Sequence, residues 1–507
     1  MNRILSIGRI RRISLILLTM NTITAFTQDY RTGPFRNGQD IGHCAIPGHF
    51  SYNQLEQTFS LSGSGENIWG TQDQYFFLWE KLNDHFIIQA RIAFQGEGKH
   101  EHRKIGIMLR KSLATDAPHV SGTVHGDGLT SLQFRALEGG ETGELRSEVN
   151  GANIIRIEKK GDRIIFSCAV YGNEFDTLSV SDIKLGEEVY AGLFICSHDN
   201  SVLESAVFSN VRIIYPAADD FVPYQDYIGS NLEIMDMETG LRKMIFQSPV
   251  SIQAPNWTPD NKYLIYNSEG LLYRYELASG EVSVLPTGSA VNNNNDHVLS
   301  FDGSMLGISN HVKADGNRSV IFVLPSSGGE PRRVTSKSPS YLHGWSPDGK
   351  YLIYTAERKG EFDIYKIGVN GKKETRLTDT PGLDDGSEYS PDGNYIYFNS
   401  SRTGTMQIWR MRPDGSGQEQ LTSGSLNDWF PHVSPDGKTL VFLSFPPDVD
   451  AADHPFYKHV LLRTIPAGGG EPRVVAYLYG GQGTINVPSW SPDGKKIAFV
   501  SNSILKK

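Results

Sequence analysis

A tetrapeptide, Ser-Pro-Asp-Gly, recurs along the second half of the chain. Four full copies and two weaker ones begin at Ser346, Ser390, Ser434, Ser491, Thr258 and Ser300. Taken in chain order, these six positions are separated by steps of 42, 46, 44, 44 and 57 residues. A period in the forties with a turn and several short strands per repeat is typical of β-propeller blades. The repeat therefore predicts a β-propeller for the second half of the chain.

The repeated tetrapeptide has the chemistry of a tight turn. In the copy that begins at Ser346, Pro347 presets φ for the second turn position and Asp348 can bond to the backbone that follows it. Gly349 can then adopt the conformation that the exit from the turn needs. An unbroken apolar run, Tyr351 to Tyr354, comes next and is typical of a strand buried on both faces.

The ends of the repeat region predict how the propeller closes. A hairpin at 232–237 and 242–246 precedes every copy of the turn, and only one strand, 496–500, follows the last copy. The two incomplete repeats complement each other. We therefore expect six blades, the sixth assembled from both ends of residues 228–507, so that no sheet edge is left free.

The first half of the chain lacks this repeat but is also rich in strand patterns. Short apolar or alternating runs separated by turn residues fill residues 28–215, as in two packed antiparallel sheets of a β-sandwich of the jelly-roll type. Residues 216–227 contain two prolines and three aspartates and interrupt the strand pattern, as a linker does. The expected class is all-β, with a sandwich followed by a propeller.

The first 27 residues have the pattern of a secretory signal. Four arginines precede a short apolar core at 13–20, and small residues at Ala25 and Thr27 suit a signal peptidase. A buried N-terminal helix is the alternative. The signal predicts a periplasmic or secreted protein, and no later apolar run is long enough to span a membrane. The formal net charge of −9 argues against a nucleic-acid partner.

The three cysteines, Cys44, Cys168 and Cys196, cannot all pair within one chain. Cys168 and Cys196 lie in apolar strand-like runs, where they could be buried thiols or could form a bridge if their strands are neighbours. None of the spacings suggests a zinc site.

The repeats at 345–354, 389–398 and 490–500 resemble those of TolB-like (WD40-like) propellers. The resemblance implies an exported, non-catalytic binding or scaffold protein with a carbohydrate or a periplasmic protein as its partner. The small α/β domain that precedes the propeller in TolB is replaced here by β structure. Related repeats also form the propellers of oligogalacturonate lyases, so a metal-dependent carbohydrate-active enzyme is the alternative.

The strings at 102–110 and 124–135 resemble concanavalin-like sandwiches, a family that often binds glycans. On this resemblance, Trp69, Arg110, His125 and Asp127 could form a glycan-binding face. The alternative is that His125 and Asp127 are loop residues and that Trp69 packs in the core.

The segments just before each propeller turn supply the candidate site. His297, His343, Glu388 and His432 occupy equivalent points in consecutive repeats, within a slip of one residue. Converging imidazoles and a carboxylate could bind Mn, Ca or Zn; the alternative is that they bond to neighbouring loops or channel water. Asp428 and an inserted loop, 446–457, which carries His454 and would act as a lid or specificity element, complete the expected propeller mouth.

Overall fold

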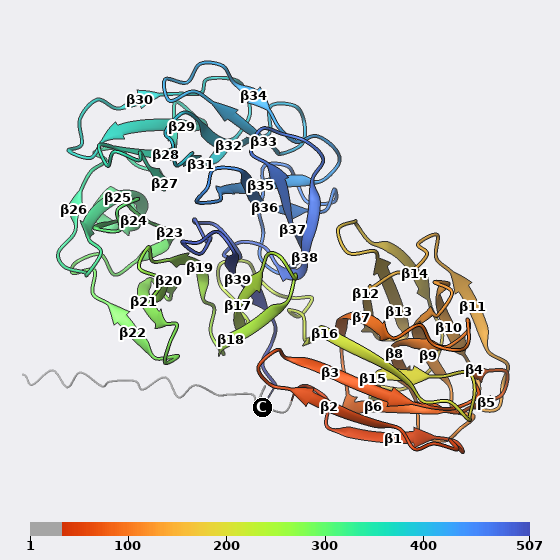
Figure 1. Cartoon of the computed structure of the whole chain (residues 1–507). Helices are drawn as coiled ribbons and strands as arrows, with labels where there is room; N and C mark the ends of the chain where they lie inside the picture. The colour runs from red at the N-terminus through yellow and green to blue at the C-terminus, as the bar shows by residue number, and fades with distance from the viewer. Residues whose placement is uncertain (1–32, 507) are drawn as a thin grey trace, which may run out of the picture.

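The computed structural model describes residues 33–506, and the predicted signal segment lies outside them. The described chain is built from antiparallel strands and one 3-10 turn, η1 (Lys313–Asp315). Figure 1 shows a ring of small sheets beside a pair of larger sheets. Residues 33–506 contain no helix with the length and hydropathy that a membrane crossing requires.

Two seven-stranded sheets form the N-terminal part, which we call the sheet pair (residues 37–214). The first sheet has the order β1 (Asn37–Ile41), β6 (Tyr75–Leu82), β15 (Val189–Cys196), β8 (Lys104–Arg110), β9 (His119–His125), β10 (Thr130–Arg135) and β11 (Gly143–Arg146). The second has the order β14 (Asp176–Val180), β13 (Arg163–Ala169), β12 (Ile154–Lys160), β7 (Phe86–Gln95), β16 (Glu204–Ile214), β3 (Thr58–Gly63) and β2 (His49–Asn53). A short hairpin, β4 (Ile68–Trp69) and β5 (Gln72–Asp73), lies apart from both sheets.

The core of the sheet pair follows from the alternation of side chains along each strand. In β8, Ile105, Ile107 and Leu109 belong to an apolar cluster that also contains Ile155 and Ile157 of β12 in the other sheet. The alternate β8 residues lie on the opposite face of the sheet. Cys168 and Cys196 are free buried thiols, Cys44 is free and half-buried, and neither Cys168 nor Cys196 forms the bridge considered above.

Five four-stranded sheets make up most of the ring. In chain order they are β19 (Gln253–Trp257), β20 (Tyr263–Ser268), β21 (Leu271–Glu276), β22 (Val282–Leu285); β23 (Asn293–Leu299), β24 (Met305–Val312), β25 (Arg318–Pro325), β26 (Arg332–Arg333); β27 (Ser340–Trp345), β28 (Tyr351–Arg358), β29 (Glu361–Gly368), β30 (Thr375–Arg376); β31 (Asp384–Tyr389), β32 (Ile396–Ser400), β33 (Gln407–Met411), β34 (Glu419–Gln420); β35 (Asn427–Val433), β36 (Thr439–Phe445), β37 (Lys458–Pro466), β38 (Arg473–Gly480).

The sixth blade joins the two ends of the propeller, which confirms the six-bladed prediction. It has the order β18 (Arg242–Ser248), β17 (Ser230–Asp236) and β39 (Lys496–Asn502). β17 pairs with β39 along its whole length, from Ser230 opposite Asn502 to Asp236 opposite Lys496. A bridge between Trp490 and Ile497 stands where the other blades have an innermost strand.

The Ser-Pro-Asp-Gly turn forms as its chemistry predicts. The Ser346 hydroxyl donates to Asp348 at 2.6 Å, the Lys350 amide donates to the same carboxylate at 3.1 Å, and the Gly349 amide donates to the Ser346 carbonyl at 2.8 Å. Asp392, Asp436 and Asp493 accept a serine hydroxyl in the same way in their own turns. Gly349 has a φ of 68°, which a side chain disfavours.

Replacing Gly349 by alanine should therefore cost about 1 kcal/mol of unfolding free energy. An added Cβ would meet nothing within 4 Å, so the cost is conformational. Gly468→Ala is the matched control, because its Cβ also enters open space and its φ is ordinary. Urea unfolding of the two variants measures the difference, and equal midpoints would contradict the expectation.

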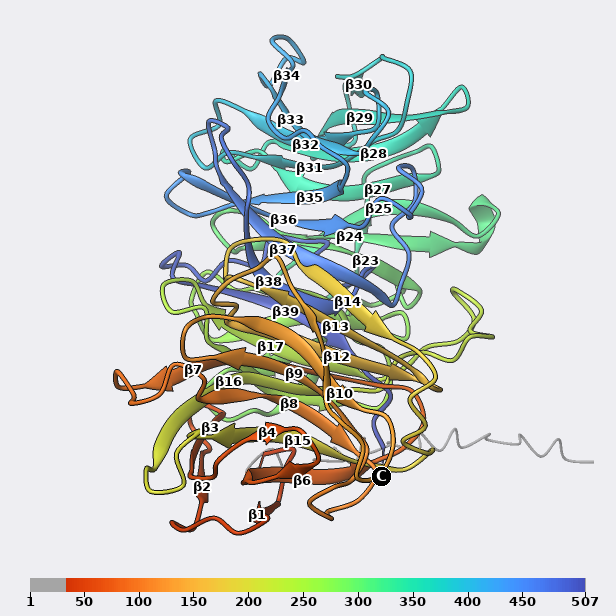
Figure 2. The same ribbon diagram turned by 90° about the vertical axis from the view of Figure 1, so that its right-hand side faces the viewer.

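The sheet pair and the propeller are joined by buried polar contacts. β16 lies beside β18 in Figure 1, and Asn210 donates to the Gly240 carbonyl at 2.9 Å. Arg212 of β16 pairs with Glu233 of β17 at 2.7 Å. At β38, the Tyr477 carbonyl accepts from Gln89 at 2.9 Å. Figure 2, turned by 90°, shows the sheet pair in front of the lower part of the ring.

Candidate functional site at the propeller mouth

A cavity of about 1040 Å³ opens at one end of the propeller channel. The innermost strands of the four-stranded blades begin near this cavity and run to their Ser-Pro-Asp-Gly turns or the weaker copies of them, which therefore lie at the opposite end. The cavity wall is rich in amide side chains and in aromatic rings: Gln253, Asn267, Asn292, Asn293, Asn294, Asn295, Gln482, Asn486, Tyr224, Tyr227, Tyr341, Phe362, Phe430 and Phe456. The wall also carries three acidic residues, Glu269, Asp296 and Asp385, and three histidines, His311, His343 and His454.

Irregularities in the innermost strands determine which side chains face the cavity. The pairing register shifts between Asn293 and His297 in β23, and between Asp385 and Glu388 in β31. The other innermost strands of the four-stranded blades have similar shifts. Bulges of this kind re-aim side chains and commonly occur at functional sites.

An ion pair between neighbouring blades forms the charged centre of the cavity. His343 Nε2 lies 2.8 Å from Asp385 Oδ1. Burial alone would lower the pKa of His343, but Asp385 and Asp296 outweigh it and raise the pKa above its usual value. Burial also opposes ionisation of Asp385, yet the charge of His343 holds the pKa of Asp385 at about 2. Each partner thus favours the charged form of the other.

Asp296 is the third charged group at this centre. Burial raises the pKa of Asp296 to about 6; Asp385 adds to the rise and His343 opposes it. Asp296 consequently changes charge near pH 6, and its ionisation adds a negative charge beside the His343–Asp385 pair.

The inserted loop, 446–457, forms part of the cavity wall through Ala452, His454 and Phe456. The His454 ring lies 4.5 Å from that of Trp429, centroid to centroid, and Phe456 packs against Tyr224 and Tyr227 of the linker at 5.3 and 5.6 Å. The linker thus shares the rim of the cavity with the inserted loop.

The structure does not bring the four expected metal ligands together. His343 lines the cavity, whereas His297 is fully buried and its Nε2 lies 3.1 Å from the Ile265 carbonyl of the preceding blade. His432 has both ring nitrogens engaged, by Glu388 and by the Ile485 carbonyl, each at 2.6 Å.

A slip of one residue explains part of this result. Glu388 and His432 stand two residues before the serine of their turn, whereas His343 stands three residues before Ser346. Because successive side chains of a strand point to opposite faces, Glu388 and His432 are expected on the face opposite to that of His343. Asp428 also lies away from the cavity, because it is buried and paired with Arg463 at 2.5 Å.

Sequence reasoning missed Asp296 and the asparagines beside it. The run of four asparagines before Asp296 was the available signal, because so many short amides in succession are unusual for a strand. Tyr341 was also missed, and nothing in its surrounding sequence distinguishes it from a core aromatic residue.

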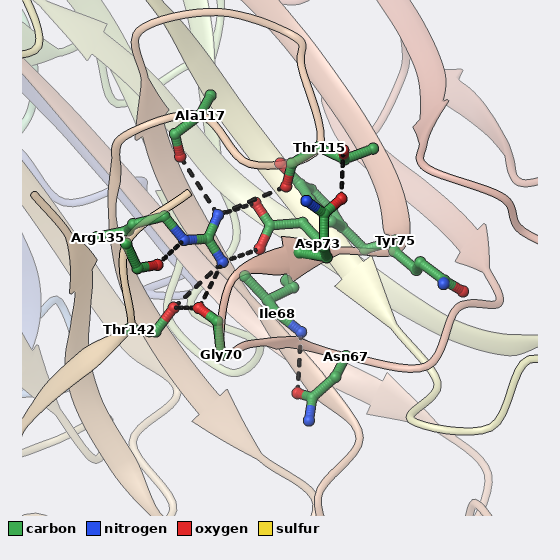
Figure 3. A network of polar contacts seen from close by, with 12 residues as sticks. Asn67, Ile68, Gly70, Asp73, Tyr75, Thr115, Ala117, Arg135 and Thr142 are labelled. Carbon is green, nitrogen blue, oxygen red and sulfur yellow. Dashed lines mark hydrogen bonds and ion pairs between the residues drawn. The ribbon is translucent and has the colours of Figure 1, made fainter. Parts of the chain in front are cut away.

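The expected glycan face of the sheet pair is only partly exposed. Trp69 is 43% exposed, but Arg110 is fully buried. Asp73, at the end of the β4–β5 hairpin, accepts two bonds from Arg135 at 2.8 and 2.9 Å (Figure 3). Arg110 pairs with the same carboxylate at 3.5 Å and also bonds to Tyr75 and to the Ala114 carbonyl. Arg110 therefore holds the hairpin and does not face solvent. His125, at the end of β9, is also buried, whereas Asp127 in the loop after it is exposed.

The ring of six blades, with polar residues gathered at one mouth, defines the class of this part of the chain as a six-bladed β-propeller. The family model of the TolB beta propeller domain matches residues 340–448. An uncharacterized protein of Agrobacterium fabrum, Atu1656, is 49% identical over 273 residues, which are 54% of this chain and 92% of that protein. The chain therefore belongs to the TolB-like β-propeller family.

Two further comparisons agree with this assignment. A solved structure described as a TolB from Agrobacterium tumefaciens is 47% identical, with a TM-score of 0.53, and the match covers 55% of this chain and all of that one. The Tol-Pal system protein TolB of Francisella tularensis is 26% identical over 151 residues, which are 29% of this chain and 32% of that protein. The chain thus spans about a third of that relative's length.

Proposed function

We propose that the protein is an exported, periplasmic binding or scaffold module that holds a partner in the propeller-mouth cavity. The observation that carries this proposal is a set of buried polar atoms in the cavity wall that have no hydrogen-bond partner: Asn293 Oδ1, Asn295 Nδ2 and the Nδ1 atoms of His343 and His454. Asn293 and Asn295 are 4% and 5% exposed. Buried polar groups are normally satisfied, so their concentration at one cavity indicates a site for a polar ligand.

A segment of a protein partner fits this cavity best. Amide side chains offer both donors and acceptors, as the backbone of an extended peptide requires. The carboxylates of Asp296 and Asp385 favour a segment that presents a positive charge, such as a lysine or an amino terminus. The relation to a protein named for the Tol-Pal system is consistent with a protein partner in the periplasm.

Carbohydrate is the second candidate ligand. The rings of Tyr341, Phe362 and Phe430 lie in the same wall as the amides, and aromatic faces beside amides also suit sugar rings. If the sheet pair is a concanavalin-like sandwich, it could bind glycan as well. We do not propose a metal-dependent lyase, because the four metal ligands that this function would need (His297, His343, Glu388 and His432) do not lie together.

Screening the full chain against a displayed peptide library and a glycan array tests the proposal. We expect peptides with a positive charge to bind, and the Asp385→Asn variant to bind them at least about 30-fold more weakly, since losing a buried charged contact costs about 2 kcal/mol or more. Asp348→Asn, at the opposite end of the channel, is the matched control and should bind normally. Glycans bound through the same cavity would favour the second candidate, and a wild-type chain that binds neither would contradict the proposal.

A further inference from the structure

Histidines gather at one end of the sheet pair, far from the cavity in sequence and in fold. The loops after β7, β9 and β15 meet there and bring together His100, His102, His125, His198 and Asp127. The His100 and His198 ring centroids lie 4.2 Å apart, and the His102 centroid lies 5.8 Å from that of His125 and 5.6 Å from that of His198. Four imidazoles, three from the loops after β7 and β15 and one from the last residue of β9, thus share one small volume.

Three of these residues converge more closely than the others. One ligand atom each from His102, His125 and Asp127 lies within 4.8 Å of the other two. The His102 Nδ1 and Asp127 Oδ2 atoms are 3.8 Å apart. Two atoms that each lie about 2.0–2.2 Å from a shared ion stand slightly closer to each other than the 3.8 Å between His102 Nδ1 and Asp127 Oδ2. Small movements of the loop side chains would therefore complete the coordination.

The histidines also have unused nitrogen atoms. The Nδ1 atoms of His102, His125 and His198 are buried and have no hydrogen-bond partner. His125 is only 6% exposed, and its Nε2 lies 3.2 Å from the Gln133 amide. The Gln133 Oε1 atom is also unpartnered, so a rotated amide could accept from Nε2–H and leave the lone pair on Nδ1, in exchange for the 3.0 Å bond that Gln133 Nε2 donates to Glu144. A buried imidazole nitrogen without a partner is an available metal ligand.

We propose that His102, His125 and Asp127 bind a divalent transition-metal ion of the Zn²⁺ type, with His198 or water in the fourth position. Two imidazoles and one carboxylate match the preference of such ions and differ from the all-oxygen sets that Ca²⁺ and Mg²⁺ prefer. Glu101 Oε1 lies 3.7 Å from His102 Nε2, where a carboxylate commonly orients a ligating ring.

One nearby cation opposes this site. Lys104 is paired across the strands with His125, and its ammonium group would repel a bound ion. That group is bonded to Asn67 at 2.5 Å and lies 5.9 Å from the centre of the Trp69 ring. Asp127 and Glu101, which both lie within 4 Å of His102, contribute two negative charges, so the cluster as a whole attracts a cation.

Metal titration of the full chain after removal of metals with chelator tests this site. We expect one Zn²⁺ per chain by calorimetry, and Co²⁺ should give the d–d absorption of a four-coordinate ion. The Asp127→Asn variant keeps the turn, because its Oδ1 still accepts from the Leu129 amide, and should bind Zn²⁺ at least about tenfold more weakly. The His102→Ala, His125→Ala double variant should weaken binding on the order of 100-fold or more.

His49→Ala, on an exposed strand of the same sheet pair, is the control and should leave the affinity unchanged. Because His125 is buried, the metal-free melting temperature of each variant must be compared with that of the wild type. Asp127→Asn decides the outcome if the double variant does not fold. A wild-type chain that binds no Zn²⁺, or an affinity that Asp127→Asn leaves unchanged, would overturn the proposal.

Discussion

Replacing Glu233 by alanine should lower the unfolding free energy by about 3–5 kcal/mol, because it leaves two arginines buried without their counter-charge. Glu233 is fully buried and pairs with Arg212 at 2.7 Å and with Arg242 at 2.8 Å. The Ser501 hydroxyl donates to it at 2.5 Å. One carboxylate thus connects β16 of the sheet pair with β17, β18 and β39 of the closing blade.

Urea unfolding followed by tryptophan fluorescence measures this effect. Glu238→Ala is the matched control, since Glu238 lies exposed in the turn between β17 and β18 and should change stability by less than about 0.5 kcal/mol. Comparable losses in the two variants would show that the buried carboxylate does not couple the two parts of the molecule.

The same carboxylate makes stability depend on pH in a defined direction. Burial would raise the pKa of Glu233, but Arg212 and Arg242 outweigh it and lower the pKa to about 2. A carboxylate whose pKa is depressed by folding stabilises the protein fully above its unfolded pKa of about 4.3. Its contribution should therefore be lost as the pH falls from about 4.5 towards 2, and the Glu233→Ala variant should lack that part of the acid dependence.

The blade architecture could be predicted because its determinants are local. Each turn is held by residues within five positions of one another, as in the bonds from Ser346 and Lys350 to Asp348, so the sequence itself displays the repeat. The complementary incomplete repeats at the two ends then predicted which strands would pair.

The candidate site could not be predicted to the same depth, because it depends on contacts between blades. His297 and His343 stand at the same distance from their turns, yet one bonds to the Ile265 carbonyl and the other pairs with Asp385. The β-bulges in β23 and β27 help to set these different side-chain directions, and no sequence pattern predicts where the bulges occur. The sequence likewise suggested that Arg110 binds a ligand, because the contact between Arg110 and Asp73 joins positions far apart in the chain and is seen only in the fold.

Removing residues 496–507 should destabilise the propeller by about 5 kcal/mol or more. The deleted strand, β39, buries Ile497, Phe499 and Val500 almost completely, and each large apolar side chain is worth about 1.5–3 kcal/mol. Its loss also exposes the edge of β17 along seven residue pairs and removes the Ser501 bond to Glu233. Removing residues 228–246 from the other end should open the same blade.

A shorter deletion separates loss of closure from loss of the chain terminus. Removing only residues 505–507 eliminates the exposed bonds of Lys506 to Asn83 and Asp84 and should cost at most about 1 kcal/mol. If the longer truncation does not fold, Phe499→Ala reports on the same strand with an expected loss of about 3–5 kcal/mol. A chain without β39 that unfolds at the wild-type urea midpoint would show that pairing of the two ends does not hold the ring closed. The cavity depends on that closure, because its wall includes Gln253 from the first complete blade and Gln482 and Asn486 from the segment just before β39.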